Sequence, residues 1–327
     1  MALVLRTLHE ELGDTAAGAA ADRALHLVRS RFDGTRWGAL FELMGGNAGI
    51  GLGALLTGDP ELAVLAVEPY LRTAEQTPAG VHWPHRTGIE SRLHHISHGT
   101  LGIVLGLARV GEATGRPDLA DLAPAGAADV VSRDEAGPEG FLVRHSTPQY
   151  RPDVVPPVSY GWCHGPAGDA QVFRLLRDLT ADPAWSALAD RCWQSVTHSG
   201  LPQRLYPGFW DNNGRCCGTA GVLALACDRF AEQRDQRERQ DPYDFARVLV
   251  ADLAARATRD GDGARWSNVE HRATPSDLEP FTGWGMGNAG IVRELLRFLR
   301  LGRVGDPGYA FTWPDQAPVQ ATDASCR

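Results

Sequence analysis

The sequence predicts an all-α protein in which helical hairpins stack side by side, either as an open solenoid or closed into a ring. A four-residue unit, G-x-x-G, occurs five times at similar spacing, and an apolar run follows each copy. Amphipathic stretches lie between these runs. Few segments look like β-strands, and residues 140–145 are the one weak candidate for a hairpin arm.

The five units define the inner helices. They begin at Gly46, Gly99, Gly165, Gly218 and Gly287, which are 53 to 69 residues apart. One such unit is common by chance in a chain with 37 glycines, but five in near register, each opening an apolar run, indicate a repeat. We expect each run to form a helix of about three turns that is buried on most sides. The glycines either permit close packing or bring free amide groups toward the centre.

Outer helices are expected where apolar residues recur every three or four positions with charges on the opposite side. These stretches are residues 22–32, 61–76, 184–198 and 243–258. We therefore predict a single helical domain over residues 1–305. Residues 306–327, which contain three prolines, are predicted to form a C-terminal tail that is loosely ordered or wrapped on the surface.

Composition narrows the class of protein. The formal charge of -8 argues against a nucleic-acid binder, and 43% hydrophobic residues suffice for a buried core. No stretch approaches the ~18 apolar residues of a membrane-spanning helix. The N-terminus lacks the pattern of a secretory signal, so we expect a cytoplasmic protein.

Three cysteines fall on the repeat. Cys163 and Cys216 both stand two residues before the first glycine of a unit, and Cys217 stands one residue before it. Adjacent inner helices would bring the three sulfur atoms to the same end of the ring, where helix N-termini favour the thiolate. Three thiolates with one open position make a plausible catalytic zinc site.

Disulfide bonds and inert core thiols are the alternatives to a metal site for these cysteines. Without a secretory signal, disulfides are disfavoured. The remaining cysteines differ in their surroundings: Cys192 and Cys227 lie in apolar helical faces and are predicted to be buried, and Cys326 is in the tail.

His98 is an acid–base candidate that shares the register of the cysteine loops. His98 directly precedes Gly99, as His164 and Cys217 precede their glycines, so it would face the same central cavity. A histidine there can act as a general acid or base or as a fourth metal ligand. Glu42, four residues before Gly46, is a candidate acid at the cavity mouth, and the alternative is an exposed loop residue.

At these residues the sequence resembles the lanthionine synthetase C-like family, the cyclases of lanthipeptide biosynthesis. The resemblance covers roughly residues 38–300, and its specific parts are S-H-G-T-L-G at 97–102, W-C-H-G-P-A-G at 162–168 and C-C-G-T-A-G at 216–221. It implies an α/α toroid of seven inner and seven outer helices around one zinc ion. It further implies that Cys163, Cys216 and Cys217 bind Zn²⁺, that His98 is the acid–base histidine, and that Glu42 replaces the usual Asp.

The sequence departs from the family pattern at three points. Cys217 stands where the third ligand is usually His, which is similar to a subset of cyclases with three-cysteine zinc. Ser159 stands where a basic residue is often found. Five of the usual seven repeats are visible and the missing two belong at the N-terminus, so the ring could be closed by fewer helices, left open, or completed by a partner chain.

The implied reaction adds peptide Cys thiols to dehydroalanine or dehydrobutyrine in a dehydrated precursor peptide. Zinc with three protein thiolates and the substrate thiolate would carry a double negative charge, so we expect a reactive nucleophile of low selectivity. His98 could protonate the enolate, and Glu42 or His164 could accept the thiol proton.

Further functions remain open on the sequence alone. One is the addition of glutathione to dehydrated residues. Another is a scaffold subunit that binds a dehydratase, or a kinase-like, lyase-like or decarboxylase partner. A glycosidase or terpene cyclase on the same toroid is more distant, because neither paired carboxylates nor Asp-rich motifs lie at the repeat starts.

Overall fold

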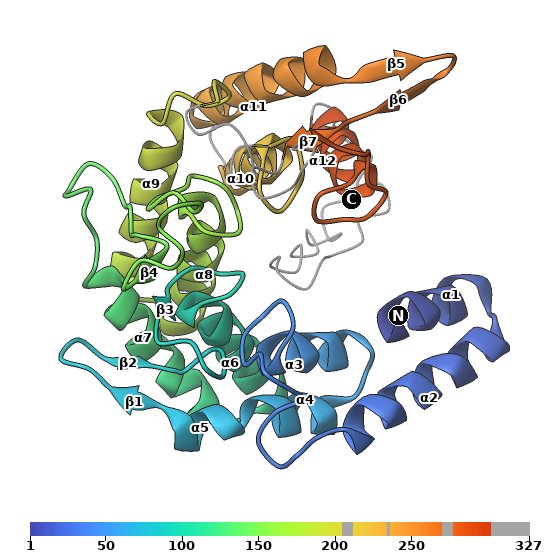
Figure 1. Cartoon of the computed structure of the whole chain (residues 1–327), viewed down its shortest axis with the longest axis vertical. Helices are drawn as coiled ribbons and strands as arrows, with labels where there is room; N and C mark the ends of the chain where they lie inside the picture. The colour runs from blue at the N-terminus through green and yellow to red at the C-terminus, as the bar shows by residue number, and fades with distance from the viewer. Residues whose placement is uncertain (205–211, 234–235, 270–276, 302–327) are drawn as a thin grey trace, which may run out of the picture.

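A computed structural model of the chain describes residues 1–204, 212–233, 236–269 and 277–301. Figure 1 shows two layers of helices, with an outer arc that surrounds an inner set. The inner helices are α3 (Asn47–Leu56), α6 (Thr100–Thr114), α8 (Pro166–Thr180), α10 (Thr219–Glu232) and α12 (Asn288–Leu301). Each begins at the second residue of a G-x-x-G unit, so the predicted all-α, two-layer repeat is confirmed. At 10 to 15 residues, four of the five are longer than the three turns expected.

The outer layer holds more helices than the sequence indicated. It consists of α2 (Thr15–Ser30), α4 (Pro60–Val67), α5 (Pro69–Thr73), α7 (Pro117–Val131), α9 (Pro183–Thr197) and α11 (Gln236–Arg256). The first helix, α1 (Ala2–Leu12), packs against α2. Inner helices contact their chain neighbours, α3 with α6, α6 with α8, α8 with α10 and α10 with α12. In Figure 1, α1 and α12 lie at the two ends of the arc.

Prolines and caps set the helix limits that differ from prediction. The single helix expected over residues 61–76 is two short helices, because Pro69 has no N–H to donate to the preceding turn and its ring crowds the carbonyl four residues earlier. Helix α2 begins seven residues before the predicted start at position 22. The Asp14 carboxylate caps it by accepting hydrogen bonds from the N–H groups of Ala16 and Ala17.

Within the described residues, four antiparallel two-stranded ribbons lie between the helices. They pair β1 (Glu75–Gln76) with β2 (Val81–His82), β3 (Arg92–Leu93) with β4 (Ser146–Thr147), β5 (Thr258–Asp260) with β6 (Gly263–Arg265), and β7 (Asn268–Val269) with β8 (Asp277–Leu278). The β3–β4 pair holds the loop after α7 against the loop before α6.

The hairpin arm expected over residues 140–145 is wrong, because these residues form no strand. Two of their backbone N–H groups donate to side chains instead of to a neighbouring strand. The N–H of Phe141 donates to Ser195 Oγ, and the N–H of Leu142 donates to Asp134 Oδ1.

A series of backbone hydrogen bonds joins the repeats through one register position, the residue two before the first glycine. The N–H of this residue donates to the carbonyl of the equivalent residue in the next unit. The series runs Met44 to Ser97, Ser97 to Cys163, Cys163 to Cys216 and Cys216 to Gly285, with distances of 2.8 to 3.2 Å. The loops that carry the cysteines are therefore fixed to each other and to both neighbouring repeats.

Close packing accounts for both glycines of every unit. A Cβ on the first glycine would lie 2.1 to 2.5 Å from the backbone of the preceding loop, and one on the last glycine would lie 1.9 to 2.4 Å from a loop carbonyl oxygen. These distances are far below any contact a Cβ makes, so each loop packs directly on the start of its helix.

The predicted tail at 306–327, with Cys326, lies outside the described residues. Among the helices that the structure describes, none combines the length and the apolar character needed to cross a bilayer.

Candidate metal centre

The three cysteines of the repeat meet at one point. Cys163, in the loop before α8, has its Sγ 3.1 Å from that of Cys217, and the Sγ atoms of Cys217 and Cys216 are 3.4 Å apart. All three sulfur atoms lie within 4.8 Å of one another. The backbone holds them there, because the N–H of Cys163 donates to the carbonyl of Cys216 at 3.1 Å.

This cluster could hold a metal ion. Thiolates around a tetrahedral zinc with Zn–S bonds of about 2.3 Å lie about 3.8 Å apart, close to the spacing of these sulfur atoms. Cys163 and Cys217 are buried, whereas Cys216 is partly exposed. The donor set is therefore soft and preformed, and it is open to solvent on the side of Cys216.

The other described cysteines do not join the cluster. Cys192 and Cys227 are fully buried in α9 and α10, as predicted, and both are free thiols. Burial raises the pKa of Cys192 well above its usual value and that of Cys227 to about 12. They behave as small apolar residues.

The two loops give their thiols opposite acidities. Burial raises the pKa of Cys163, because the thiolate would lose its hydration. The pKa of Cys216 is lowered, first by hydrogen bonds from Cys163 and Cys217 to its sulfur. Neighbouring thiols therefore favour the thiolate at Cys216, whereas burial disfavours it at Cys163.

His98 and Glu42 form a pair beside the cluster. His98 Nδ1 lies 3.4 Å from Glu42 Oε1, and the His98 side chain is 44% exposed while that of Glu42 is fully buried. The Glu42 carboxylate accepts hydrogen bonds from the backbone N–H groups of Met44 and Gly45. The alternative of an exposed loop residue is therefore wrong for Glu42. Ser97, which precedes His98 in the chain, donates from both its N–H and its hydroxyl to the carbonyl of Cys163, which places the pair next to the cysteine loop.

His164 directly follows Cys163 in the cysteine loop and lies beside His98. Its ring stacks on that of His98, with centroids 5.6 Å apart and an interplanar angle of 23°. Its Nε2 is 3.2 Å from Ser97 Oγ, and that hydroxyl donates to the carbonyl of Cys163 at 2.8 Å. Burial lowers the pKa of His164 well below its usual value, so the ring stays neutral.

His95 and Asp169 form a fully buried pair that was not predicted from the sequence. His95 Nδ1 lies 2.7 Å from Asp169 Oδ2, and both side chains are fully buried. His95 Nε2 is 3.2 Å from the carbonyl of Val143, and its ring lies 6.1 Å from that of His164. The register carried a signal for both residues. His95 holds the place that Glu42 holds in the first unit, and Asp169 stands where the other units have Ile50, Ile103, Val222 and Ile291.

The fold and the cluster together define a class, an α/α toroid with a cysteine cluster that could hold a metal ion at the start of its inner helices. The chain belongs to the lanthionine synthetase C-like family, whose model matches residues 1–151 and 155–240. Among curated proteins, no sequence matches.

Three solved structures share the fold of this chain. Nisin cyclase superposes with a TM-score of 0.62 at 15% identity, over 91% of this chain and 74% of that one. A structure titled "UGL_D88N/dGlcA-Glc-Rha-Glc" gives a TM-score of 0.58 at 19% identity, over 92% and 85% of the two chains. The Lin0763 protein from Listeria innocua gives 0.53 at 12% identity, over 91% and 81%. At these identities the three structures establish the toroid fold.

Proposed function

We propose that the chain is a zinc-dependent lanthionine synthetase. It would add Cys thiols of a dehydrated precursor peptide to dehydroalanine or dehydrobutyrine and form (methyl)lanthionine thioether rings. The observation that carries the proposal is the three-sulfur cluster beside the His98–Glu42 pair, in a chain of this family. The fold shared with nisin cyclase agrees with it.

The residues fit the metal that the function needs. Cys163, Cys216 and Cys217 would hold Zn²⁺, and their sulfur atoms are already close enough together to do so. When bound, zinc supplies a lowered pKa for a coordinated thiol, so that the thiolate is available at neutral pH.

The protein's own groups would handle the protons. Addition forms a bond between the thiol sulfur and Cβ of dehydroalanine, the double-bond electrons move toward Cα and the carbonyl, and Cα takes up a proton. The sum of the step is one thiol added across one double bond, and it needs no oxidant. His98 is exposed and held by a buried carboxylate, so it is the group suited to protonate Cα.

Glu42 and His164 would orient His98. Glu42 accepts two backbone hydrogen bonds, which fix its carboxylate and let it stabilise the imidazolium form of His98. His164 is neutral and buried, so we assign it to supporting the His98 ring, in preference to accepting the thiol proton.

Metal analysis combined with a cyclisation assay tests the proposal. We expect purified protein to contain one zinc ion and to cyclise a dehydrated peptide with a free Cys, as measured by loss of alkylatable thiol in mass spectra. Cys217→Ala should lose the zinc, whereas His98→Asn should keep the zinc and lose cyclisation. Cys192→Ala is the matched control, since it removes a buried thiol outside the cluster and should change neither. Full zinc occupancy in Cys217→Ala would remove Cys217 from the ligand set.

The same assay separates the alternative functions of this fold. Replacing the peptide thiol with glutathione tests addition to dehydrated residues in trans. Native protein without metal that captures a dehydratase, kinase-like or decarboxylase partner would favour a scaffold subunit and would overturn the proposal.

A further inference from the structure

An arginine interrupts an apolar position of the repeat. The residue three before the first glycine is large and apolar in four units, which have Leu43, Ile96, Trp162 and Trp284 at this place. The fourth unit has Arg215 instead, and this side chain is completely buried. Burying a cation costs free energy unless it is paired. Arg215 therefore has to be explained by what it contacts.

Among the described residues, two tryptophan rings and the Glu294 carboxylate contact this guanidinium. Its Cζ lies 5.3 Å from the ring centroids of both Trp162 and Trp284, and these two rings meet edge to face at 5.4 Å. Its Nε donates to Oε1 of Glu294 on α12 at 3.1 Å, and Glu294 is also completely buried. Cation–π contacts and a charge-assisted hydrogen bond thus replace the lost hydration.

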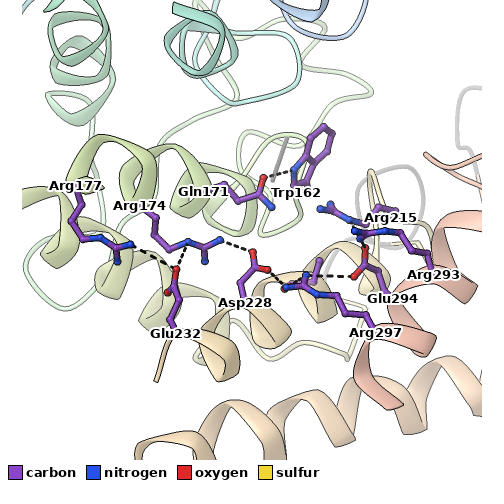
Figure 2. Close-up of polar contacts among 11 residues, drawn as sticks. Trp162, Gln171, Arg174, Arg177, Arg215, Asp228, Glu232, Arg293, Glu294 and Arg297 are labelled. Carbon is purple, nitrogen blue, oxygen red and sulfur yellow. Dashed lines mark hydrogen bonds and ion pairs between the residues drawn. The ribbon is translucent and has the colours of Figure 1, made fainter. Parts of the chain in front are cut away.

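Arg215 is one end of a larger charge network, which Figure 2 shows running across α8, α10 and α12. Glu294 also pairs with Arg293 and Arg297, Arg297 pairs with Asp228, and Arg174 joins Asp228 to Glu232. The carboxylate beside Arg215 is therefore shared among three arginines, Arg215, Arg293 and Arg297.

The positively charged side chain of Arg215 belongs to the loop that carries Cys216 and Cys217. Arg215 immediately precedes Cys216 in the chain, and Trp162, on which it stacks, immediately precedes Cys163. The two cysteine loops are joined by the hydrogen bond from the Cys163 N–H to the Cys216 carbonyl. A metal centre of three thiolates is anionic, and a substrate thiolate would add a further negative charge. A buried anionic centre is stabilised by a fixed cation nearby.

We propose that Arg215 is a positioning residue of the metal centre, which supplies a fixed positive charge behind Cys163 and Cys216 and fastens both loops to α12. The inference rests on the proposed function only in that the cluster binds a metal. Packing alone does not call for Arg215, since four other units fill this place with apolar side chains. Replacing a buried ion pair with apolar residues is often neutral or stabilising.

Two variants of one ion pair test the charge. Arg215→Leu places at this position the residue that the first unit has there, and it should weaken Zn²⁺ binding on the order of tenfold. Glu294→Gln removes a negative charge beside Arg215 and should bind Zn²⁺ at least as tightly as the native protein. Both variants are expected to lower thermal stability. Arg215→Leu should therefore lower both stability and Zn²⁺ affinity, whereas Glu294→Gln should lower stability without lowering Zn²⁺ affinity. Zn²⁺ affinity is measured by competition with a chelator, and Co²⁺ substitution reports thiolate ligation by its charge-transfer absorption.

Arg174→Leu is the matched control. Arg174 is a buried arginine of the same network, but it lies eight residues beyond Pro166 at the start of α8, about 12 Å along the helix. It should lower stability and leave Zn²⁺ affinity unchanged. If Arg215→Leu fails to fold, Arg215→Lys and Arg215→Gln replace it, and the charged lysine variant should bind Zn²⁺ about tenfold more tightly than the glutamine variant.

The outcomes separate the two proposals. Native protein that binds neither Zn²⁺ nor Co²⁺ would remove the metal centre and with it the proposed function. Native protein that binds Zn²⁺ while Arg215→Leu binds equally tightly would overturn the role of Arg215 and leave the cyclase proposal intact. Equal weakening by Arg215→Leu and Glu294→Gln would show that the pair acts through folding alone.

Discussion

Gly168 lies where the Cys163 loop of the third unit packs on its inner helix, α8, and adding one methyl group there should disturb both folding and metal binding. A Cβ at this position would lie 2.0 Å from the carbonyl oxygen of Trp162 and 2.6 Å from Cγ2 of Ile96. Real Cβ atoms essentially never come within 3.0 Å of another heavy atom, so the loop has to withdraw by about 1 Å. It cannot do so freely, because the N–H and carbonyl of Cys163 bond Cys216 and Ser97.

The size of the effect follows from two opposing contributions. Overpacking of this kind costs about 1–3 kcal/mol, and the higher value applies where backbone is the obstacle. Alanine regains up to about 1 kcal/mol of helix propensity over glycine. We therefore expect Gly168→Ala to lower the free energy of unfolding by about 2 kcal/mol. A loop shift of about 1 Å also exceeds the ~0.2 Å tolerance of a metal–ligand distance, so Zn²⁺ affinity should fall as well.

Urea unfolding with a chelator present measures the folding contribution without metal, and a Zn²⁺ competition titration measures the second. Gly53→Ala is the matched control, because Gly53 lies inside α3 and a Cβ there would meet nothing within 4 Å. That variant should gain about 0.5–1 kcal/mol and bind Zn²⁺ normally. The reasoning is refuted if Gly168→Ala is as stable as the native protein and binds Zn²⁺ with unchanged affinity.

Two further predictions concern buried ionisable groups. Burial lowers the pKa of His94 to about 2 and that of His85 to about 4, so below pH 6.5 the unfolded chain takes up protons that the folded protein does not. The free energy of unfolding of the metal-free protein should therefore fall between pH 6.5 and about 4, by about 1.4 kcal/mol per pH unit for each histidine. Urea unfolding at several pH values checks this, with a His85→Gln/His94→Gln variant, which lacks both histidines, for comparison. Glu42→Gln should keep Zn²⁺ and slow cyclisation by about 10- to 100-fold, because His98 loses its charged partner; an unchanged rate would exclude that role.

The register of the repeat made most of the fold and the sulfur cluster predictable. Once the five glycine units were aligned, Cys163 and Cys216 occupied one position, and the structure joins that position from unit to unit by a backbone hydrogen bond. Equivalent positions in a stacked repeat are necessarily neighbours in space, so sequence alone could place three sulfur atoms together. The same argument put His98 and His164 side by side, where their rings stack.

Features that do not recur at the same position of each unit were not predictable in this way. The two-residue strands of the ribbons are too short to show an alternating pattern, and β3 and β4 lie more than 50 residues apart. The burial of Glu42 depends on the backbone N–H groups of Met44 and Gly45, which only the folded loop directs at its carboxylate. The Arg215–Glu294 pair likewise joins residues 79 positions apart, one in the loop before α10 and one on α12.

The positions at which the repeat breaks its own pattern are the informative ones. A unit that only has to stack can reuse the same apolar residues, as Ile50, Ile103, Val222 and Ile291 do at the position that Asp169 fills in the third unit. Arg215 breaks a different apolar position, in the fourth unit. These two units also supply the cysteines, and each buried charge costs desolvation that a leucine or isoleucine would avoid. Because Asp169 holds His95 near His164 and Arg215 lies behind Cys216, both costs fall at the metal cluster, where fixed charges would serve the chemistry and where stacking alone gives no reason for them.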